Sequence, residues 1–277
     1  PVDDIILITE TKISTQNAFG KILDQYAKND TEFGNRIITT SPDVSVSTNL
    51  GPWINKKGLF SRTDSSDTFR DRKIPSAQKW IFSSQGQHIE LGIAEMNLFL
   101  MLGAAGLSHE LFGERLFPIG TVYDPFIARG LDAMNYACYQ DARFMIVGTP
   151  SGVSLAPEGG AHQSIGTPLI GISQPGLLSY EPAFADELSI IMNYGFNYLQ
   201  DENGGSIYLR LTTRSIEQPL RDINHELKQN VIKGGYWLRE PGPNPEIIII
   251  YQGVVASEAV EATGLLGEKF KDVGVLG

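Results

Sequence analysis

The sequence predicts an α/β protein whose mainly parallel sheet is sandwiched by helices. Short apolar runs of strand length alternate with segments that carry apolar residues at helical spacing, which is the pattern of repeated βαβ units. The richest glycine-containing and polar loops follow the ends of the strands. Because ligands in such folds bind beyond the carboxyl ends of the strands, we expect a binding site among these loops.

The first elements follow from apolar spacing and from turn residues. Residues 15–27 carry apolar side chains at helical spacing, and Ser14 or Thr15 supplies a cap, which predicts a helix. A β-branched run at 36–40 predicts a strand that ends in a Ser-Pro-Asp turn. Residues 49–87 show no period, so we expect a long loop, which in a compact domain is usually functional or mobile.

Regular order returns in the middle of the chain. Residues 93–107 are almost wholly apolar and predict a helix with Leu98, Leu102 and Ala105 facing inward. The elements expected after it are a strand at 115–120, a helix at 125–140, a buried strand at 144–148, a polar glycine-rich loop at 156–166, a strand at 177–180, a helix at 183–200 and a strand at 206–211.

The last part of the chain predicts a second unit. The pattern weakens into polar residues at 216–230, and a strand, a helix and a strand follow at 246–251, 256–270 and 273–276. One β-α unit cannot bury both faces of its sheet, so this segment indicates the opening of another α/β domain. We therefore expect an extension at 1–12, a domain at 13–215, a linker at 216–241 and a truncated domain at 242–277.

Composition and charge restrict the classes of partner. Of 277 residues 42% are hydrophobic and 19% charged, as in a globular protein with a sizeable core. The net charge of −10, from 32 acidic and 22 basic residues, argues against binding to nucleic acids or anionic membranes. Ordinary cytosolic acidity explains the same balance.

Cysteine usage and the absence of targeting segments indicate the compartment. Cys138 is the single cysteine, which excludes a disulfide framework and predicts a small core residue in a reducing, cytoplasmic setting. No run approaches the roughly 20 apolar residues of a membrane span. The acidic start lacks a signal peptide and an initiator methionine, so we expect an excised piece of a longer chain.

Four common catalytic motifs are absent from the sequence, and one histidine stands out by its position. The patterns HExxH, GxxxxGK[ST], GxGxxG and GxSxG do not occur. Of the four histidines, only His162 stands in a glycine-rich loop, where it either takes part in chemistry or braces the loop.

Glu95 lies near the start of the otherwise apolar helix at 93–107. A carboxylate there interacts favourably with the helix dipole, so capping is one interpretation. Apolar neighbours also indicate partial burial, and a buried carboxylic acid can share a proton with a ligand nitrogen. Tyr123 and Phe126, one helical turn apart, either pack in the core or face a flat ring.

Several collinear segments resemble the transketolase-like thiamine diphosphate superfamily. Gly92-Ile93-Ala94-Glu95 resembles its GI-x-E signature, and Gly159 to Gln163 resembles its G-x-x-H-Q loop. The segment from Gly120 to Phe126, with Arg129 and Asp132, and the strand from Tyr208 to Arg214 recur in the same order. The resemblance spans about residues 13–214 and implies the thiamine diphosphate-binding fold.

Within this superfamily the chain is most similar to the homodimeric decarboxylating component of 2-oxoacid dehydrogenase complexes of the pyruvate type. Transketolase and deoxyxylulose-phosphate synthase are the near alternatives, and the basic residues of the 49–87 loop leave sugar-phosphate binding open: Lys56, Lys57, Arg62, Arg70, Arg72 and Lys73. The diphosphate-binding domain, with the GDG motif and asparagine that hold Mg²⁺, matches nothing here. The resemblance thus implies thiamine diphosphate and Mg²⁺ as cofactors, no metal ligands in this chain, and an inactive fragment.

The resemblance also assigns roles to individual residues. In the family the glutamate that matches Glu95 bonds the aminopyrimidine ring nitrogen and drives the cofactor to its reactive tautomer. Phe126 would stack on the pyrimidine, Tyr123 would lie beside it, and Arg129 would lie near its amino group. His162 would face the substrate, and Asp43 matches an acidic position near the cofactor.

The resemblance implies partners as well. A small 2-oxoacid would be the substrate, a second copy would complete a homodimer, and a lipoyl-bearing acyltransferase would receive the product. A non-catalytic dimerisation module remains a third interpretation, because the apolar helix at 93–107 serves an interface as well as a core.

Overall fold

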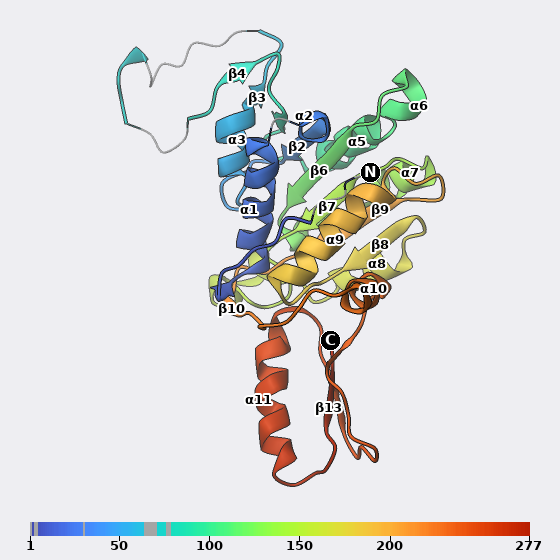
Figure 1. Ribbon diagram of the computed structural model, residues 1–277. Helices are drawn as coiled ribbons and strands as arrows, with labels where there is room; N and C mark the ends of the chain where they lie inside the picture. Colours follow the sequence, from blue (N-terminus) through green and yellow to red (C-terminus); the bar gives the residue numbers. More distant parts are fainter. Residues whose placement is uncertain (1, 3–4, 30, 64–70, 76–78) are drawn as a thin grey trace.

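A computed structural model describes residues 2, 5–29, 31–63, 71–75 and 79–277. Its main sheet has eight strands, and every pair of neighbours in it is parallel (Figure 1). The mainly parallel sheet expected from the sequence is therefore confirmed. In spatial order the strands are β4 (Phe82–Ser83), β3 (Leu59–Phe60), β5 (His88–Glu90), β2 (Ile37–Ser41), β6 (Phe117–Val122), β7 (Met145–Gly148), β9 (Ser206–Arg210) and β8 (Leu177–Tyr180).

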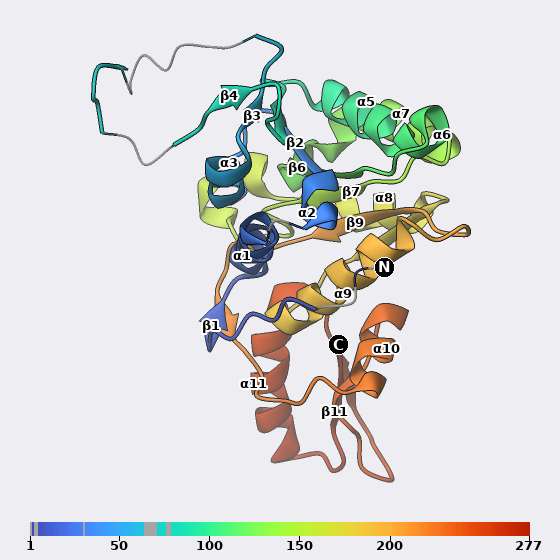
Figure 2. The same cartoon turned by 45° about the horizontal axis from the view of Figure 1, so that its top comes forward.

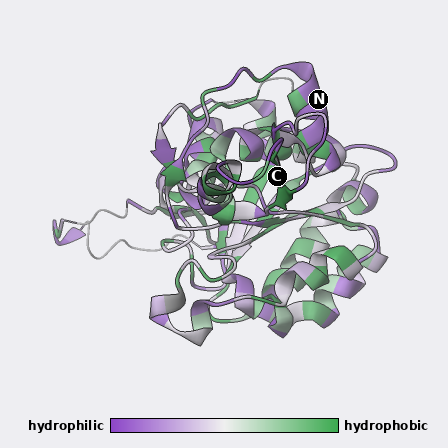
Figure 3. Ribbon diagram, turned by 90° about the horizontal axis from the view of Figure 1, so that it is seen from below, coloured by the Kyte–Doolittle hydropathy of each residue, from purple (hydrophilic) through white to green (hydrophobic). Residues whose placement is uncertain are grey.

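Helices cover both faces of this sheet (Figure 2). One face packs against α1 (Thr15–Lys28), α3 (Gly51–Lys57) and α9 (Ala185–Tyr198). The other packs against α5 (Glu95–Gly106), α7 (Leu131–Tyr139) and α8 (Thr167–Ser173). Each face has its own apolar core, and hydrophobic stretches run along the strands and helices in Figure 3. Cys138 packs at the margin of the second core and is only partly buried.

Local signals in the sequence account for the helices that were expected. Ser14 caps α1 by accepting a hydrogen bond from the backbone N–H of Asn17 at 3.1 Å. In α5 the inward residues are those expected, and its glycines face close neighbours: a Cβ at Gly106 would lie 2.7 Å from the backbone nitrogen of Arg143. The shorter helices are α2 (Glu32–Arg36), α6 (Ser108–Phe112), η1 (Asp124–Gly130), η2 (Ala156–Glu158) and η3 (Gly160–His162).

Two expectations for this unit were wrong in part. Residues 49–87 are not one loop, because they contain α3, β3 and β4; α3 is seven residues long and buries only Trp53 and Ile54, which is too few to show a period. The expected helix at 125–140 is divided into the 3₁₀ helix η1, which ends at Gly130, and α7, which begins at the next residue. The expectation for Arg70 falls outside the described residues.

A second, smaller unit follows, shown in orange and red in Figure 1. Strand β13 (Gly274–Leu276) lies between β12 (Ile248–Ile250), which is parallel to it, and β11 (Trp237–Arg239), which is antiparallel. Its helices are η4 (Gly253–Val255) and α11 (Ala256–Gly267).

The segment 216–241 is more ordered than a linker. It contains β10 (Ile216–Glu217), α10 (His225–Lys233) and β11, so the segment expected as a linker carries regular elements of its own. Helix α10 is capped by Asn224 but buries only Val231, which is why its sequence reads as polar. Strand β10 pairs with β1 (Lys12–Ile13), and this two-stranded clasp joins the two ends of the main unit.

Candidate functional site

The residues singled out by the sequence gather at one edge of the main sheet. Because its strands are parallel, their carboxyl ends share that edge, and the loops that follow them meet there. Asp43 follows β2, Glu95 follows β5, and His162 lies in the loop after β7. Tyr123, Phe126 and Arg129 lie in and just before η1, after β6.

Glu95 is the first residue of α5, and its side chain lies against the apolar core. It is 8% exposed, in keeping with its apolar neighbours in the sequence. Its Oε1 accepts a hydrogen bond from Arg129 Nη1 at 2.8 Å, which also forms an ion pair. The helix start thus presents one carboxylate, held by one cation, at the ligand-binding edge of the sheet.

Three side-chain rings lie in a row that begins at the ion pair between Glu95 and Arg129. The Arg129 guanidinium lies 3.8 Å from the centre of the Phe126 ring, a cation–π contact. The centres of Phe126 and Tyr123 are 6.0 Å apart, and those of Tyr123 and His162 are 5.3 Å apart. Phe126 and Tyr123 are partly exposed, so these rings form a surface and not only core packing.

His162 brings a ring nitrogen with unused hydrogen-bonding capacity. Its Nδ1 is buried and finds no hydrogen-bond partner among the described residues. Its Nε2 lies 3.9 Å from Glu158 Oε2, which is too long for a hydrogen bond. A buried polar atom without a partner is costly, so this nitrogen is suited to meet a ligand.

Asp43 stands apart from this row. It is exposed, in a left-handed backbone conformation (φ 62°), and its N–H donates to Glu90 Oε1 at 2.7 Å. Its loop touches the row through Ser47, whose hydroxyl accepts from Tyr123 at 2.9 Å. The structure therefore brings together five of the six predicted residues and leaves Asp43 one loop away.

A buried cluster beneath the Asp43 loop was not expected from the sequence. His88 is fully buried, with Nδ1 2.8 Å from Thr39 Oγ1 and Nε2 3.0 Å from Ser45 Oγ. Ser45 also donates to Glu90 Oε2 at 2.6 Å. Burial alone would raise the pKa of Glu90, but hydrogen bonds from His88, Ser45 and the Asp43 N–H outweigh it and lower that pKa to about 2.

This pKa predicts a stability that depends on pH. The folded value lies below the usual value of about 4.3, so ionised Glu90 stabilises the fold at neutral pH, and the contribution is lost as the pH falls toward 2. We expect Glu90→Gln to lower the free energy of unfolding at pH 7 by about 2 kcal/mol, allowing for partial exposure. Urea unfolding at pH 7, 4 and 3 measures this; a deficit that does not shrink below pH 4 would contradict it, and Glu226→Gln on exposed α10 is the control.

A second buried network lies directly behind the rings. Asp124 is fully buried and accepts hydrogen bonds from Thr167 at 2.6 Å, from Tyr208, and from Arg210 Nε at 3.3 Å. Arg210 also pairs with Glu181. Burial, followed by the nearby Asp124 charge, raises the pKa of Tyr208, so its hydroxyl remains a donor. Asp124 and Arg210 lie inside the motifs quoted above, which was the only signal for them.

Two features that a protein can carry, a metal-binding cluster and a membrane-spanning helix, are missing from the described residues. Within the described part of the chain, no group of three or more His, Cys, Asp or Glu side chains is arranged to hold a metal ion. The same residues include no helix with the length and apolar character needed to cross a bilayer.

Comparison with known proteins identifies the family. The family model described as the pyruvate dehydrogenase E1 component middle domain matches residues 8–219. The chain belongs to this family. Relatives of this E1 middle domain include the pyruvate dehydrogenase E1 components of Mycolicibacterium smegmatis, 28% identical over 92% of this chain, and Escherichia coli, 25% identical over 95% of it.

These matches cover only part of the relatives. The chain spans 27% of the M. smegmatis protein and 29% of the E. coli protein. Solved structures similar to this E1 middle domain include transketolases from Leishmania mexicana (TM-score 0.75, 18% identity, 98% of this chain and 35% of that one) and Campylobacter jejuni (0.77, 16%, 100% and 37%). At this identity they establish the fold, which is transketolase-like.

Proposed function

We propose that this chain supplies the pyrimidine-binding half of a thiamine diphosphate site in a 2-oxoacid dehydrogenase decarboxylating component of the pyruvate type. The observation that carries the proposal is the row that runs from the buried Glu95 carboxylate through Arg129 and two aromatic rings to His162. A carboxylic acid and a stacking surface suit a flat ring that can take up a proton. A free imidazole nitrogen suits the ketone of the substrate.

Glu95 acts on the ring nitrogen. The cofactor, when bound, supplies the electron sink for decarboxylation. The Glu95 carboxyl, largely removed from water, holds a proton between itself and the aminopyrimidine nitrogen. Arg129 covers one face of Phe126, so the pyrimidine stacks there only after the guanidinium moves; the side chain is 53% exposed and has room to do so.

His162 acts on the substrate side of the row. Its Nδ1 has no partner among the described residues, and its ring lies against Tyr123. There it stabilises a developing alkoxide on the 2-oxoacid or moves a proton to it. Tyr123 would lie beside the pyrimidine, and Asp43 would approach the cofactor from its own loop.

The rest of the site comes from elsewhere. The GDG motif and asparagine with which the family holds Mg²⁺ have no counterpart in this sequence, so the proposal assigns Mg²⁺ and the diphosphate to the family's diphosphate-binding domain. We assign residues 13–215 to the pyrimidine-binding domain and 242–277 to the start of the C-terminal domain. A cytoplasmic enzyme that passes its product to a lipoyl-bearing acyltransferase follows from the same assignment.

A second copy of the protein covers an apolar face beside Glu95. Ile93, Met96 and Leu100 are exposed at and before α5, and Tyr136 and Tyr139 are exposed on α7, which packs against α5. Exposed apolar residues this close together mark an interface. Because Ile93 and Met96 flank Glu95 in the chain, a contact on this face would bring the partner's half-site to Glu95 and make the enzyme a homodimer.

The dimer is testable with one charged residue. Leu100→Asp places a carboxylate in the centre of this face, where it would be buried without a partner, at a cost of several kcal/mol to association. We expect sedimentation velocity to show monomers of the complete enzyme, with unchanged far-UV circular dichroism. Val260→Asp, at an equally exposed apolar residue on α11, is the control; a Leu100→Asp variant that stays dimeric would contradict the assignment.

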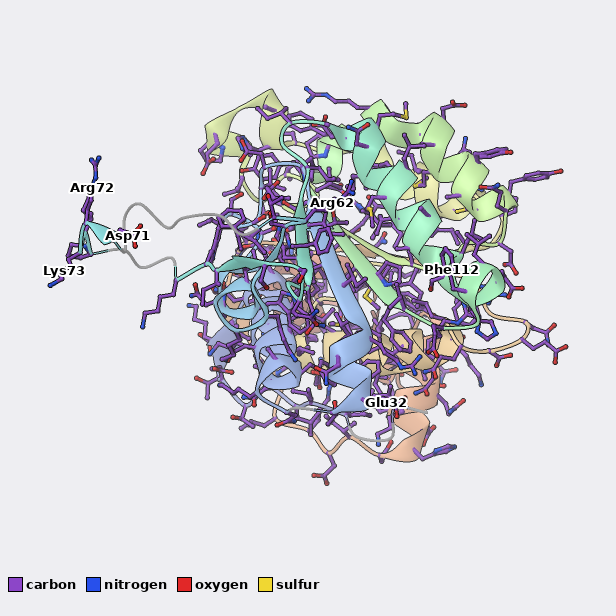
Figure 4. All side chains as sticks on the ribbon, turned by 90° about the horizontal axis from the view of Figure 1, so that it is seen from above. Glu32, Arg62, Asp71, Arg72, Lys73 and Phe112 are labelled. Carbon is purple, nitrogen blue, oxygen red and sulfur yellow. The ribbon has the colours of Figure 1, made fainter. Side chains whose placement is uncertain are left out.

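Substrate assays separate this proposal from a transketolase-type enzyme. A sugar phosphate needs cations in the site, but Lys56 pairs with Asp24 and Lys57 bonds Asn35. In Figure 4 the labelled side chains of Arg72 and Lys73 lie away from the body of the molecule. We expect the complete enzyme to consume pyruvate with an artificial electron acceptor and not a ketose phosphate; the reverse result would overturn the proposal.

A further inference from the structure

We infer that Asp124 and Arg210 form a positioning pair that holds the ring segment, residues 123–129, and the His162 loop in one fixed arrangement. The inference rests on the proposed function, because it assigns both residues to that site. Neither touches the predicted ligand surface: Asp124 is fully buried and Arg210 is 3% exposed.

Asp124 anchors the ring segment. It is the first residue of η1 and lies between Tyr123 and Phe126 in the chain. Its carboxylate takes hydrogen bonds from Thr167 at the start of α8 and from Tyr208 and Arg210 on β9. These donors come from two separate elements, so the segment that carries both rings is tied to the sheet and to α8 through one side chain.

Arg210 anchors the His162 loop. Its Nη2 donates to the carbonyl oxygen of Ser164 at 3.1 Å, two residues after His162. Ser164 in turn exchanges backbone contacts with Gly152: its N–H donates to the Gly152 carbonyl at 2.9 Å, and its hydroxyl accepts from the Gly152 N–H at 2.9 Å. The Arg210 guanidinium therefore binds the loop at Ser164, where the loop pairs with Gly152.

Replacing Arg210 or Asp124 is expected to shift the segments that the pair holds. One guanidinium serves Asp124, Glu181 and Ser164 in different directions, and the single ammonium of lysine cannot reach all three. A lysine that pairs with one of the two carboxylates leaves the other without its cation, which is strongly destabilising in a buried site, so the segments shift to compensate. A displacement of about 1 Å in a catalytic group costs on the order of 100-fold in rate.

Arg143 offers a matched control at the other edge of the sheet. It is 6% exposed, pairs with Asp141, and donates to the carbonyl oxygen of Asp201 at 3.2 Å. It precedes β7, whereas Arg210 ends β9, and Gly148 at the end of β7 is in register with Arg210. Arg143→Lys thus alters a similarly buried guanidinium far from the rings, one whose carboxylate partner, Asp141, is exposed.

Hydrogen exchange of the complete enzyme without cofactor tests the coupling directly. We expect Arg210→Lys to lower the protection of peptides that cover 123–130 and 156–166 together, and Arg143→Lys to leave both unchanged. Asp124→Asn, which keeps the shape and removes the charge, should reproduce the Arg210→Lys pattern and serves if Arg210→Lys does not fold. Unchanged protection in the folded Asp124 or Arg210 variant, or equal losses in the Arg143 variant, would overturn the inference.

A double-mutant cycle tests whether Arg210 acts through His162. With pyruvate as substrate, we expect Arg210→Lys to lower kcat by about 100-fold in the wild type and only a few-fold in a His162→Ala background, since interacting residues are not additive. Equal factors in both backgrounds would indicate a merely structural role and reject the positioning role. A wild type without pyruvate activity would instead contradict the proposed function, while the exchange experiment would still decide on the pair.

Discussion

Glu95→Gln in the complete enzyme is expected to lower turnover of pyruvate at saturating cofactor by about 10³-fold or more, the combined size of proton-transfer and electrostatic contributions. Glutamine keeps the shape of the side chain and can still accept from Arg129, so α5 should form as before. What it removes is the proton that Glu95 would share with the ring nitrogen in the proposed role. Steady-state kinetics with an artificial acceptor provide the measurement.

The matched control for this variant is another glutamate at a helix start. Glu32 is the first residue of α2 and pairs with Arg36 at 2.9 Å, much as Glu95 pairs with Arg129, but it is exposed. Glu32→Gln should leave turnover within two-fold, because surface ion pairs contribute little. Turnover close to that of the wild type in Glu95→Gln would sink the role proposed for Glu95.

Gly148→Ala should have the second largest effect, this time on folding. Gly148 ends β7, and a Cβ there would overlap the Asp124 carboxylate. That carboxylate is held by Thr167, Tyr208 and Arg210 and has no space to retreat. Overpacking of this kind costs about 3 kcal/mol in the free energy of unfolding.

Denaturant unfolding of the purified chain measures this loss. Gly264→Ala in α11 is the control, since beyond the chain neighbours and the backbone of its own helix no described atom would lie within 4 Å of its Cβ, and alanine in a helix interior should be stabilising by about 1 kcal/mol. A Gly148→Ala protein as stable as the wild type would mean that the Asp124 network rearranges at little cost in free energy. That result would contradict the fixed arrangement proposed for Asp124 and Arg210.

The parts of the site that are local in sequence were predictable, and the parts that depend on distant contacts were not. Glu95 could be placed at a buried helix start from its apolar neighbours alone, and the rings of Tyr123 and Phe126 from their spacing. Asp124 and Arg210 are 86 positions apart, and no period relates them. His88 and Ser45 likewise meet only because β2 and β5 are neighbours in the sheet.

The same reasoning explains the errors in the fold. Helix α3 is missing from the prediction because a seven-residue helix with two buried side chains leaves no pattern. Helix α10 leaves no apolar period either, because most of its residues face water. In both cases too few side chains are buried for a helical pattern to show in the sequence.

The clasp between β1 and β10 gives the main unit a modular character. Lys12 lies opposite Glu217 and Ile13 opposite Ile216, so the chain enters and leaves the unit at one point. A unit with adjoining ends can be inserted into a longer polypeptide at a single surface position without stretching its neighbours. Gene fusion and recombination can therefore transfer this half-site into proteins with other domain orders, provided that the transferred segment includes both β1 and β10.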